Sequence, residues 1–243
     1  MKNEGCFLLI LFLVFQFGAE AQTPSGAGRM LNRLKSATAP GDTIPSKDEV
    51  TAGLREALTV GTARTVNRLA AVDGYFGDAA RKILLPPEAV KVEKNLRAMG
   101  LGRQVDQAIL TMNRAAEDAA KSATPIFVEA IRNMTLTDAM GILRGGDTAA
   151  TSYLQSTTSA GLTTAFRPII DSSLRKVDAT RHWKNIFTTY NRVAREKVDP
   201  DLTAWVTHRA MEGLFRQLAQ EERLIRKDPL ARSSELLRKV FKQ

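Results

Sequence analysis

The sequence predicts an all-α protein: a single multi-helix, bundle-like domain that follows a signal peptide and a flexible linker. Three observations predict this class. Apolar residues recur at helical spacing after residue 46, helix caps and Gly or Pro breaks separate the periodic segments, and no stretch shows the two-residue alternation of a half-buried strand. We therefore expect eight or so helices and no sheet.

The first 21 residues have the three-part pattern of a secretory signal peptide. Lys2 lies in a short polar start, an apolar run covers residues 6–17, and Ala19-Glu20-Ala21 gives the small-x-small pattern of a cleavage site. The run is too short to span a bilayer comfortably, and no later stretch is long and apolar enough. We predict a periplasmic or secreted protein whose mature chain has no transmembrane segment; a retained membrane anchor is the alternative.

The only cysteine, Cys6, lies inside the predicted signal peptide, so the mature chain would have neither disulfides nor thiol chemistry. Residues 22–45 are rich in Gly, Pro, Ser, Thr and Ala, which is typical of a flexible linker. The helical domain is therefore expected over residues 46–243.

Helix signals begin at the start of this domain. Ser46 and Glu49 match a capping box, which predicts a helix from residue 47 to about residue 74. Asp78 is a candidate cap for a second helix, which Pro86 and its neighbouring proline interrupt before a third begins. Gly100 is a typical left-handed C-cap for that third helix.

The stretch 105–154 is the part of the chain around which we expect the other helices to pack. Arg103 begins its first helix, and Pro125 either kinks this helix or starts a successor. A wide apolar face is formed by Val105, Ala108, Ile109, Met112, Ala115, Ala116 and Ala119. Because small side chains let helix axes come close, more than one helix can pack against this face.

The second half of the domain carries further caps. Thr135 and Asp138 match a capping box for a short helix that ends at the Gly-Gly pair 145–146, and Asp147 is the candidate cap of the next helix. We expect another helix from residue 162, with Pro168 near its start, and an aromatic-rich helix at 180–195. The last long helix begins near residue 200 and runs to Lys227, and a serine at 233 or 234 caps a final turn.

Lys and Arg number 35 against 26 Asp and Glu, for a formal net charge of +9. For an exported protein, this excess favours an anionic envelope component, such as lipid head groups or polysaccharide, over nucleic acid. Another envelope protein is a further candidate partner, through exposed apolar residues. The alternative is that the charge only keeps the protein soluble.

Glu221 is in an unusual place for a carboxylate. On the last long helix it lies about 20° from Leu214, near the centre of an apolar stripe. A buried carboxylate needs a cation or several donors, and Glu222 and Arg226 follow closely enough to take part in such a network. Either this group ties the C-terminal helix to the bundle, or Glu221 lines a polar pocket.

Asn113 and Glu117 are one helical turn apart and border the apolar face of the helix that begins at Arg103. They are either ligand contacts or ordinary polar neighbours at a helix crossing. Our candidate ligand-binding set is therefore Asn113, Glu117, Glu221, Glu222 and Arg226.

The sequence offers no positive support for catalysis. His182 and His208 are the only histidines and are far apart in the sequence, and the HExxH and GxSxG patterns do not occur. We assign no catalytic residue, metal or cofactor. The favoured hypothesis is a non-catalytic binding or scaffolding protein of the bacterial cell envelope. The alternative is a hydrolase that uses Glu221 or Glu222 as acid or base.

Three blocks resemble the signature of the bacterial family called domain of unknown function 4197: MNRAAEDAA at Met112, MTLTDAMGILRGGDTAATSYL at Met134 and EERLIRKDPLARSSELLRKVF at Glu221. The resemblance covers essentially the whole chain from Ser46, including GLREAL at 53 and ILLPPEAV at 83. It implies an exported, mainly helical protein of Gram-negative bacteria, and it brings neither an activity nor catalytic residues.

Overall fold

The computed structural model describes residues 46–176 and 201–227, together with 178, 181, 183, 184, 188, 191, 192 and 199. The predicted signal peptide (1–21) and linker (22–45) lie outside these residues, as do most of the helix predicted at 180–195 and the turn predicted after residue 233. A compact unit begins at Pro45. Its described residues form helices and turns without any strand, which confirms the all-α class.

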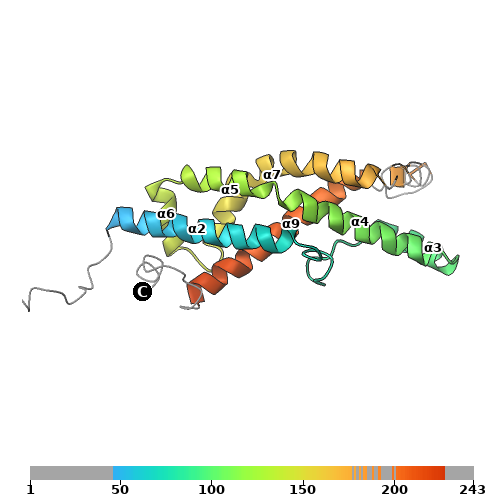
Figure 1. Ribbon diagram of the computed structural model, residues 1–243, viewed down its shortest axis with the longest axis horizontal. Coiled ribbons are helices and arrows are strands. Elements are labelled where there is room, and N and C mark those ends of the chain that lie inside the picture. The colour runs from blue at the N-terminus through green and yellow to red at the C-terminus, as the bar shows by residue number, and fades with distance from the viewer. Residues whose placement is uncertain are drawn as a thin grey trace, which may run out of the picture. The chain divides into compact units, whose positions relative to one another are not determined.

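The described elements, in chain order, are α2 (Lys47–Ala70), the 3₁₀ turn η1 (Pro87–Ala89), α3 (Val90–Ala98), α4 (Gly102–Ala120), α5 (Ala123–Arg132), α6 (Leu136–Arg144), α7 (Ala149–Arg175) and α9 (Leu202–Lys227) (Figure 1). Within the described ranges, none of these helices is both long and apolar enough to cross a bilayer.

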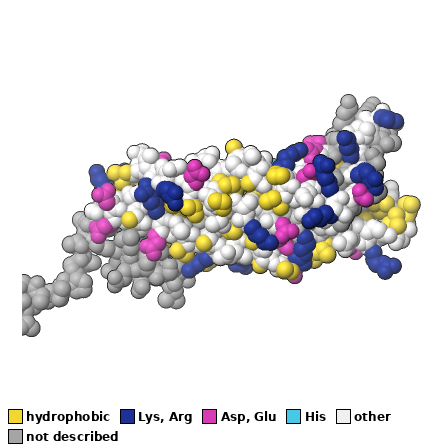
Figure 2. Space-filling view, turned by 45° about the horizontal axis from the view of Figure 1, so that its top comes forward, with side chains coloured by type: hydrophobic (Ala, Val, Ile, Leu, Met, Phe, Trp, Pro, Cys, Tyr) yellow, Lys and Arg dark blue, Asp and Glu magenta, His cyan; other side chains and the backbone are white. Residues whose placement is uncertain are grey.

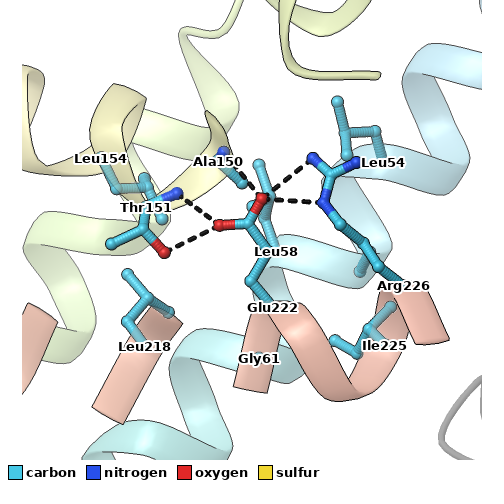
Figure 3. Close-up of a pocket in the computed structure, with 11 residues that line it drawn as sticks. Leu54, Leu58, Gly61, Ala150, Thr151, Leu154, Leu218, Glu222, Ile225 and Arg226 are labelled. Atoms are coloured by element: carbon cyan, nitrogen blue, oxygen red, sulfur yellow. Dashed lines mark hydrogen bonds and ion pairs between the residues drawn. The ribbon is translucent and has the colours of Figure 1, made fainter. Parts of the chain in front are cut away.

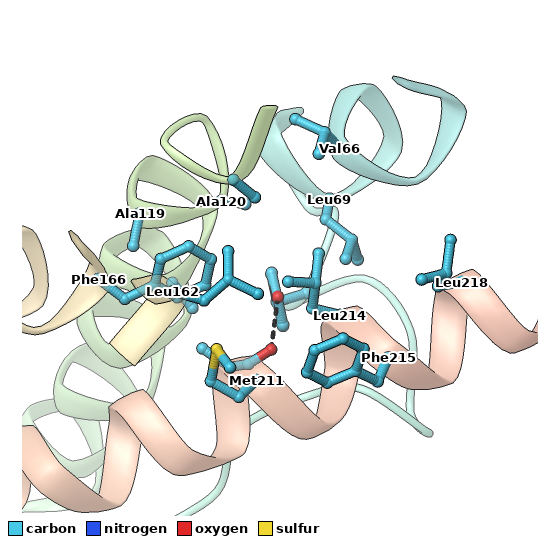
Figure 4. Packing of buried hydrophobic residues seen from close by; sticks show 14 of the residues in the cluster. Val66, Leu69, Ala119, Ala120, Leu162, Phe166, Met211, Leu214, Phe215 and Leu218 are labelled. Atoms are coloured by element: carbon cyan, nitrogen blue, oxygen red, sulfur yellow. Dashed lines mark hydrogen bonds between the residues drawn. The ribbon is translucent and has the colours of Figure 1, made fainter. Parts of the chain in front are cut away.

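Four long helices, α2, α4, α7 and α9, form the centre of this unit. The predicted central helix corresponds to α4, which packs against α2, α3, α7 and α9. It can take several partners because Ala115, Ala116, Ala119 and Ala120 are all fully buried. Figure 4 shows the alanines of α4 beside Leu162 and Phe166 of α7, with side chains of α2 and α9 completing the core.

The helix ends agree closely with their sequence signals. Both predicted capping boxes form: the Glu49 amide donates to the Ser46 hydroxyl at 3.2 Å, and the Asp138 amide donates to the Thr135 hydroxyl at 3.1 Å. Gly100 has the predicted left-handed conformation, with φ of 79°. The amide after it donates back to the Leu96 carbonyl at 2.9 Å, as in a Schellman motif. Pro125 falls in the first turn of the separate helix α5.

Three expectations for individual elements were wrong. No helix lies between α2 and Pro86, because the α2–α3 connection, residues 71–86, is made of turns and irregular chain whose polar groups bond to α4 and α9. Asp147 does not cap α7; it forms an ion pair with Lys227 at 2.8 Å. Helix α7 is one helix of 27 residues with Pro168 inside it, rather than two helices.

Packing explains why Pro168 does not break α7. The apolar positions Leu162, Phe166, Ile170 and Leu174 are fully buried on both sides of the proline, whereas Pro168 itself is exposed. A proline inside a helix costs about 3 kcal/mol, whereas burying a large apolar side chain contributes about 1.5–3 kcal/mol, so burying four on one face of α7 exceeds that cost.

Candidate functional site

The residues that we expected to bind a ligand lie on α4 and α9, and all are largely buried. Asn113 is 0% exposed, Glu117 4%, Glu221 6% and Glu222 8%, and the side chain of Arg226 is 14% exposed. The structure divides them between two groups of contacts. Asn113, Glu117 and Glu221 belong to a connection cluster, which holds the α2–α3 connection. Glu222 and Arg226 form an α7 cluster at the start of that helix.

In the connection cluster, Asn113 fixes the main chain at Ile83. Its Oδ1 accepts from the Ile83 amide at 2.8 Å, and its Nδ2 donates to the Ile83 carbonyl oxygen at 2.8 Å. The same Nδ2 donates to the Ile109 carbonyl oxygen at 2.8 Å. Both donors and the acceptor of the side-chain amide are therefore engaged inside the protein, and none is turned toward a ligand.

Glu117 holds the turn at the start of the same connection. Its Oε1 accepts from the amides of Tyr75 and Phe76 at 3.1 and 3.3 Å. Its Oε2 lies 2.6 Å from a guanidinium nitrogen of Arg114, which also binds Asp73 at 2.7 Å. The buried carboxylate thus has the donors and the cation that burial requires.

Glu221 reaches the connection through Gln217. The Gln217 Nε2 donates to Glu221 Oε1 at 3.0 Å, and Gln217 Oε1 accepts from Arg81 at 2.6 Å. Arg81, only 7% exposed, also pairs with Asp78 at 2.9 Å. Glu221 is therefore linked through the Gln217 amide to a buried arginine of the α2–α3 connection.

Tyr75 anchors the connection in the core, and sequence reasoning missed it. The fully buried side chain donates from its hydroxyl to the Ala210 carbonyl oxygen at 2.8 Å. Burial raises the pKa of Tyr75 far above its ordinary value, so the hydroxyl remains a proton donor. Gly213 makes room for the ring, because a Cβ there would lie 2.6 Å from Tyr75 Cε1. A lone Tyr and a lone Gly gave no sequence signal for this contact.

In the α7 cluster, Glu222 caps α7 from a different helix. Its Oε1 accepts from the Ala150 amide at 2.9 Å, and its Oε2 accepts from the amide and the hydroxyl of Thr151, each at 2.8 Å (Figure 3). Arg226 donates to Glu222 Oε1 at 3.0 Å and to the Ile142 carbonyl oxygen at 2.9 Å. Helix α7 has no side-chain cap from its own N-cap residue, so α9 supplies the acceptor and a favourable negative charge.

A cavity of about 30 Å³ lies beside Glu222 and is lined mostly by aliphatic side chains of α2, α7 and α9 (Figure 3). This volume is about that of one water molecule. Clefts that bind small molecules are about ten times larger or more. The cavity is therefore a packing defect next to the cap and not a substrate site.

The two clusters join helices, and their geometry gives no support to hydrolysis. The oxygens of Glu222 accept from main-chain and side-chain donors, and Glu221 is buried beside Gln217. A general acid or base needs room for a substrate within hydrogen-bond reach, which these contacts do not provide. Within the described part of the chain, no group of three or more His, Cys, Asp or Glu residues could hold a metal ion.

The same clusters leave positive charge on the surface. Three carboxylates, Glu117, Glu221 and Glu222, are buried, whereas Arg81 is the one buried cation of the described residues. The net charge of the exposed side chains is therefore two units more positive than the net charge of all the described residues together. Exposed cations without an ion-pair partner in the described ranges include Arg64, Arg68, Lys91, Lys94, Arg103, Arg216 and Arg223. Figure 2 shows Lys and Arg side chains spread over the visible face, with fewer acidic ones between them.

Comparison with known proteins identifies a family. The family model described as "Protein of unknown function (DUF4197)" matches residues 44–242, a range that includes both clusters. No curated protein and no solved structure matches the chain.

Proposed function

Because the chain belongs to the DUF4197 family of proteins of unknown function, we propose its role from its geometry: it is a non-catalytic binding protein of the bacterial cell envelope. Its exposed cations hold an anionic partner, such as lipid head groups or polysaccharide. The signal-peptide pattern at residues 1–21 supports a periplasmic or secreted location.

The distribution of charge carries this proposal. The fold uses its buried carboxylates internally, on the α2–α3 connection and on the start of α7, whereas every described Lys and Arg except Arg81 is at least partly exposed. Arg64 and Arg68 lie one turn apart on α2, both exposed. Arg216 and Arg223 are exposed on α9, which packs against α2. Such a surface attracts anions, even though the attraction from each single exposed cation is weak.

The expected strength is modest and depends on salt. A Lys or Arg close to an anionic membrane surface contributes about 1 kcal/mol, and several together give measurable binding. Because exposed charges are screened over about 8 Å at physiological ionic strength, the binding should weaken steeply as salt is added. A partner held mainly by apolar contacts would not show this dependence.

Sedimentation with lipid vesicles, alongside an anionic polysaccharide, tests the proposal. The protein should bind phosphatidylglycerol vesicles or the polysaccharide at low salt, and phosphatidylcholine vesicles much less. Arg64→Gln combined with Arg68→Gln should weaken the binding. The matched control, Asn67→Gln on the same exposed side of α2, leaves the charge unchanged and should not. Failure to bind either anionic material at low salt would overturn the proposal.

A further inference from the structure

A shallow groove lies along the outer side of α6, and we propose that it binds a single-chain amphiphile with an anionic head group. The α6 groove has a volume of about 440 Å³ and is lined by Lys47, Leu136, Thr137, Met140, Gly141 and Arg144. Clefts for small ligands span about 300–1,000 Å³, so the size suits one acyl chain. The inference deepens the proposed function and rests on it for the negative charge of the partner.

The floor of the α6 groove is apolar and open. Leu136 is 41% exposed, and Met140 is half-buried beside it. Gly141 also lines the groove, and a Cβ there would have nothing within 4 Å, so the space beside it is open. The opposite side of the same helix carries the buried residues Ala139 and Ile142, which belong to the core. Helix α6 therefore has an inner face that is already packed and an outer apolar face that is not.

Two cations and no acid line the groove. Lys47 is the first residue of α2 and Arg144 the last residue of α6; both are exposed, and neither forms an ion pair with a described residue. The neighbouring carboxylate of Asp138 is held at the α6 cap, where the Thr135 amide donates to it at 2.9 Å. Arg144 lies eight residues after Leu136, or about 12 Å along the helix. The apolar row therefore ends at a positive charge.

This arrangement selects an amphiphile over the other occupants. An inorganic anion or a polysaccharide would use the cations and leave the exposed Leu136 and Met140 in water. A second copy of this chain that presents the same groove would bring Lys47 and Arg144 against like charges. A chain with an anionic head uses both features, since its methylenes cover the apolar floor while its head lies at Arg144.

Dodecyl phosphate, kept below the concentration at which it forms micelles, is the probe. We expect saturable binding by calorimetry, together with a shift of the Met140 methyl resonance. Dodecanol and inorganic phosphate, tested separately, should each bind at least about tenfold more weakly, because each lacks one half of the recognition. Equal binding of either compound would overturn the assignment.

Substitutions locate the site. Gly141→Trp should fill the groove and abolish binding while the thermal midpoint is kept, because nothing lies within 4 Å of the new side chain's Cβ. Gly146→Trp is the matched control: its Cβ is equally unobstructed, and the residue does not line the groove. Leu136→Asn serves as a second groove variant should Gly141→Trp lower the thermal midpoint. Full binding by a folded groove variant would refute the proposal.

Charge variants separate this inference from the proposed function. Lys47→Gln with Arg144→Gln should weaken dodecyl phosphate binding, whereas Lys91→Gln with Lys94→Gln, an equal loss of charge on α3, should not. If dodecyl phosphate fails to bind while anionic vesicles still do, the α6 groove is excluded and the proposed function stands. If dodecyl phosphate binds but no anionic vesicle or polysaccharide does, the groove stands and the general anionic surface is excluded.

Discussion

Replacing Glu222 with alanine is the sharpest test of how this fold is held together. The substitution removes the acceptor for the amides of Ala150 and Thr151, which have no partner inside the first turn of α7. It also removes the Glu222 carboxylate from the guanidinium of Arg226, whose side chain is only 14% exposed. One change thus uncaps a 27-residue helix and removes a carboxylate that pairs with a mostly buried cation.

The size of the effect follows from these contacts. Leaving a buried donor unsatisfied costs about 1–3 kcal/mol, and removing one partner of a buried ion pair costs about 3–5 kcal/mol. These costs overlap, because Arg226 can still donate to the Ile142 carbonyl oxygen and the cavity beside Glu222 can admit one water. We expect Glu222→Ala to lower the free energy of unfolding by about 3–4 kcal/mol.

Urea unfolding followed by far-ultraviolet circular dichroism measures this loss. Glu212→Ala is the matched control. Glu212 lies on the same helix and pairs with Arg209, but its own side chain is 43% exposed. Exposed pairs of this kind contribute about 1 kcal/mol or less. If Glu222→Ala cost no more than Glu212→Ala, the carboxylate would not be the cap of α7, and the α7 cluster would have to be reconsidered.

Three further predictions concern single side chains. Asn113→Ala should lower the free energy of unfolding in urea by about 3 kcal/mol, because the buried amide and carbonyl of Ile83 lose their partner. A loss below about 1 kcal/mol would contradict the role of Asn113 in holding Ile83. The Thr135 side chain and amide lower the pKa of Asp138, so its stabilising effect is present above the ordinary aspartate pKa and is lost as pH falls through the lowered value. The thermal midpoint of Asp138→Asn should therefore fall less in acid than that of the unmodified protein, and parallel curves would contradict this. Glu221→Gln should leave the urea midpoint unchanged or raise it, because among the described residues only Gln217 donates a hydrogen bond to the Glu221 carboxylate. A loss of stability as large as that of Glu222→Ala would contradict this expectation.

Local signals predicted the helix ends well. The capping boxes at Ser46 and Thr135 and the left-handed Gly100 formed as expected, because each depends on residues only three to five positions apart. The burial of the central helix was predictable for a similar reason, since its alanines recur on one face. Contacts of this range can be inferred before the fold is known.

Contacts between distant segments were not predictable in the same way. Asp147 stands at a normal capping position, yet the start of α7 is capped by Glu222, 72 residues from Ala150. The segment before Pro86 has the composition of a helix, but the side chain of Asn113, 30 residues away, bonds the main-chain amide and carbonyl of Ile83 outside any helix. In both cases a tertiary hydrogen bond outweighs a local preference, and the local sequence does not show which distant residue forms that bond.

Glu221 and Glu222 show how far the sequence alone can carry a functional hypothesis. The helical pattern placed a carboxylate on the apolar side of α9, and both residues are indeed buried. A buried carboxylate can equally cap a helix or activate a substrate, and the pattern is the same in either case. The difference lies in the donors: α7 amides and Arg226 occupy Glu222, and Gln217 connects Glu221 to Arg81. Since the acidic groups are used to hold the fold, binding by this protein must be sought among the cations and apolar side chains that remain outside.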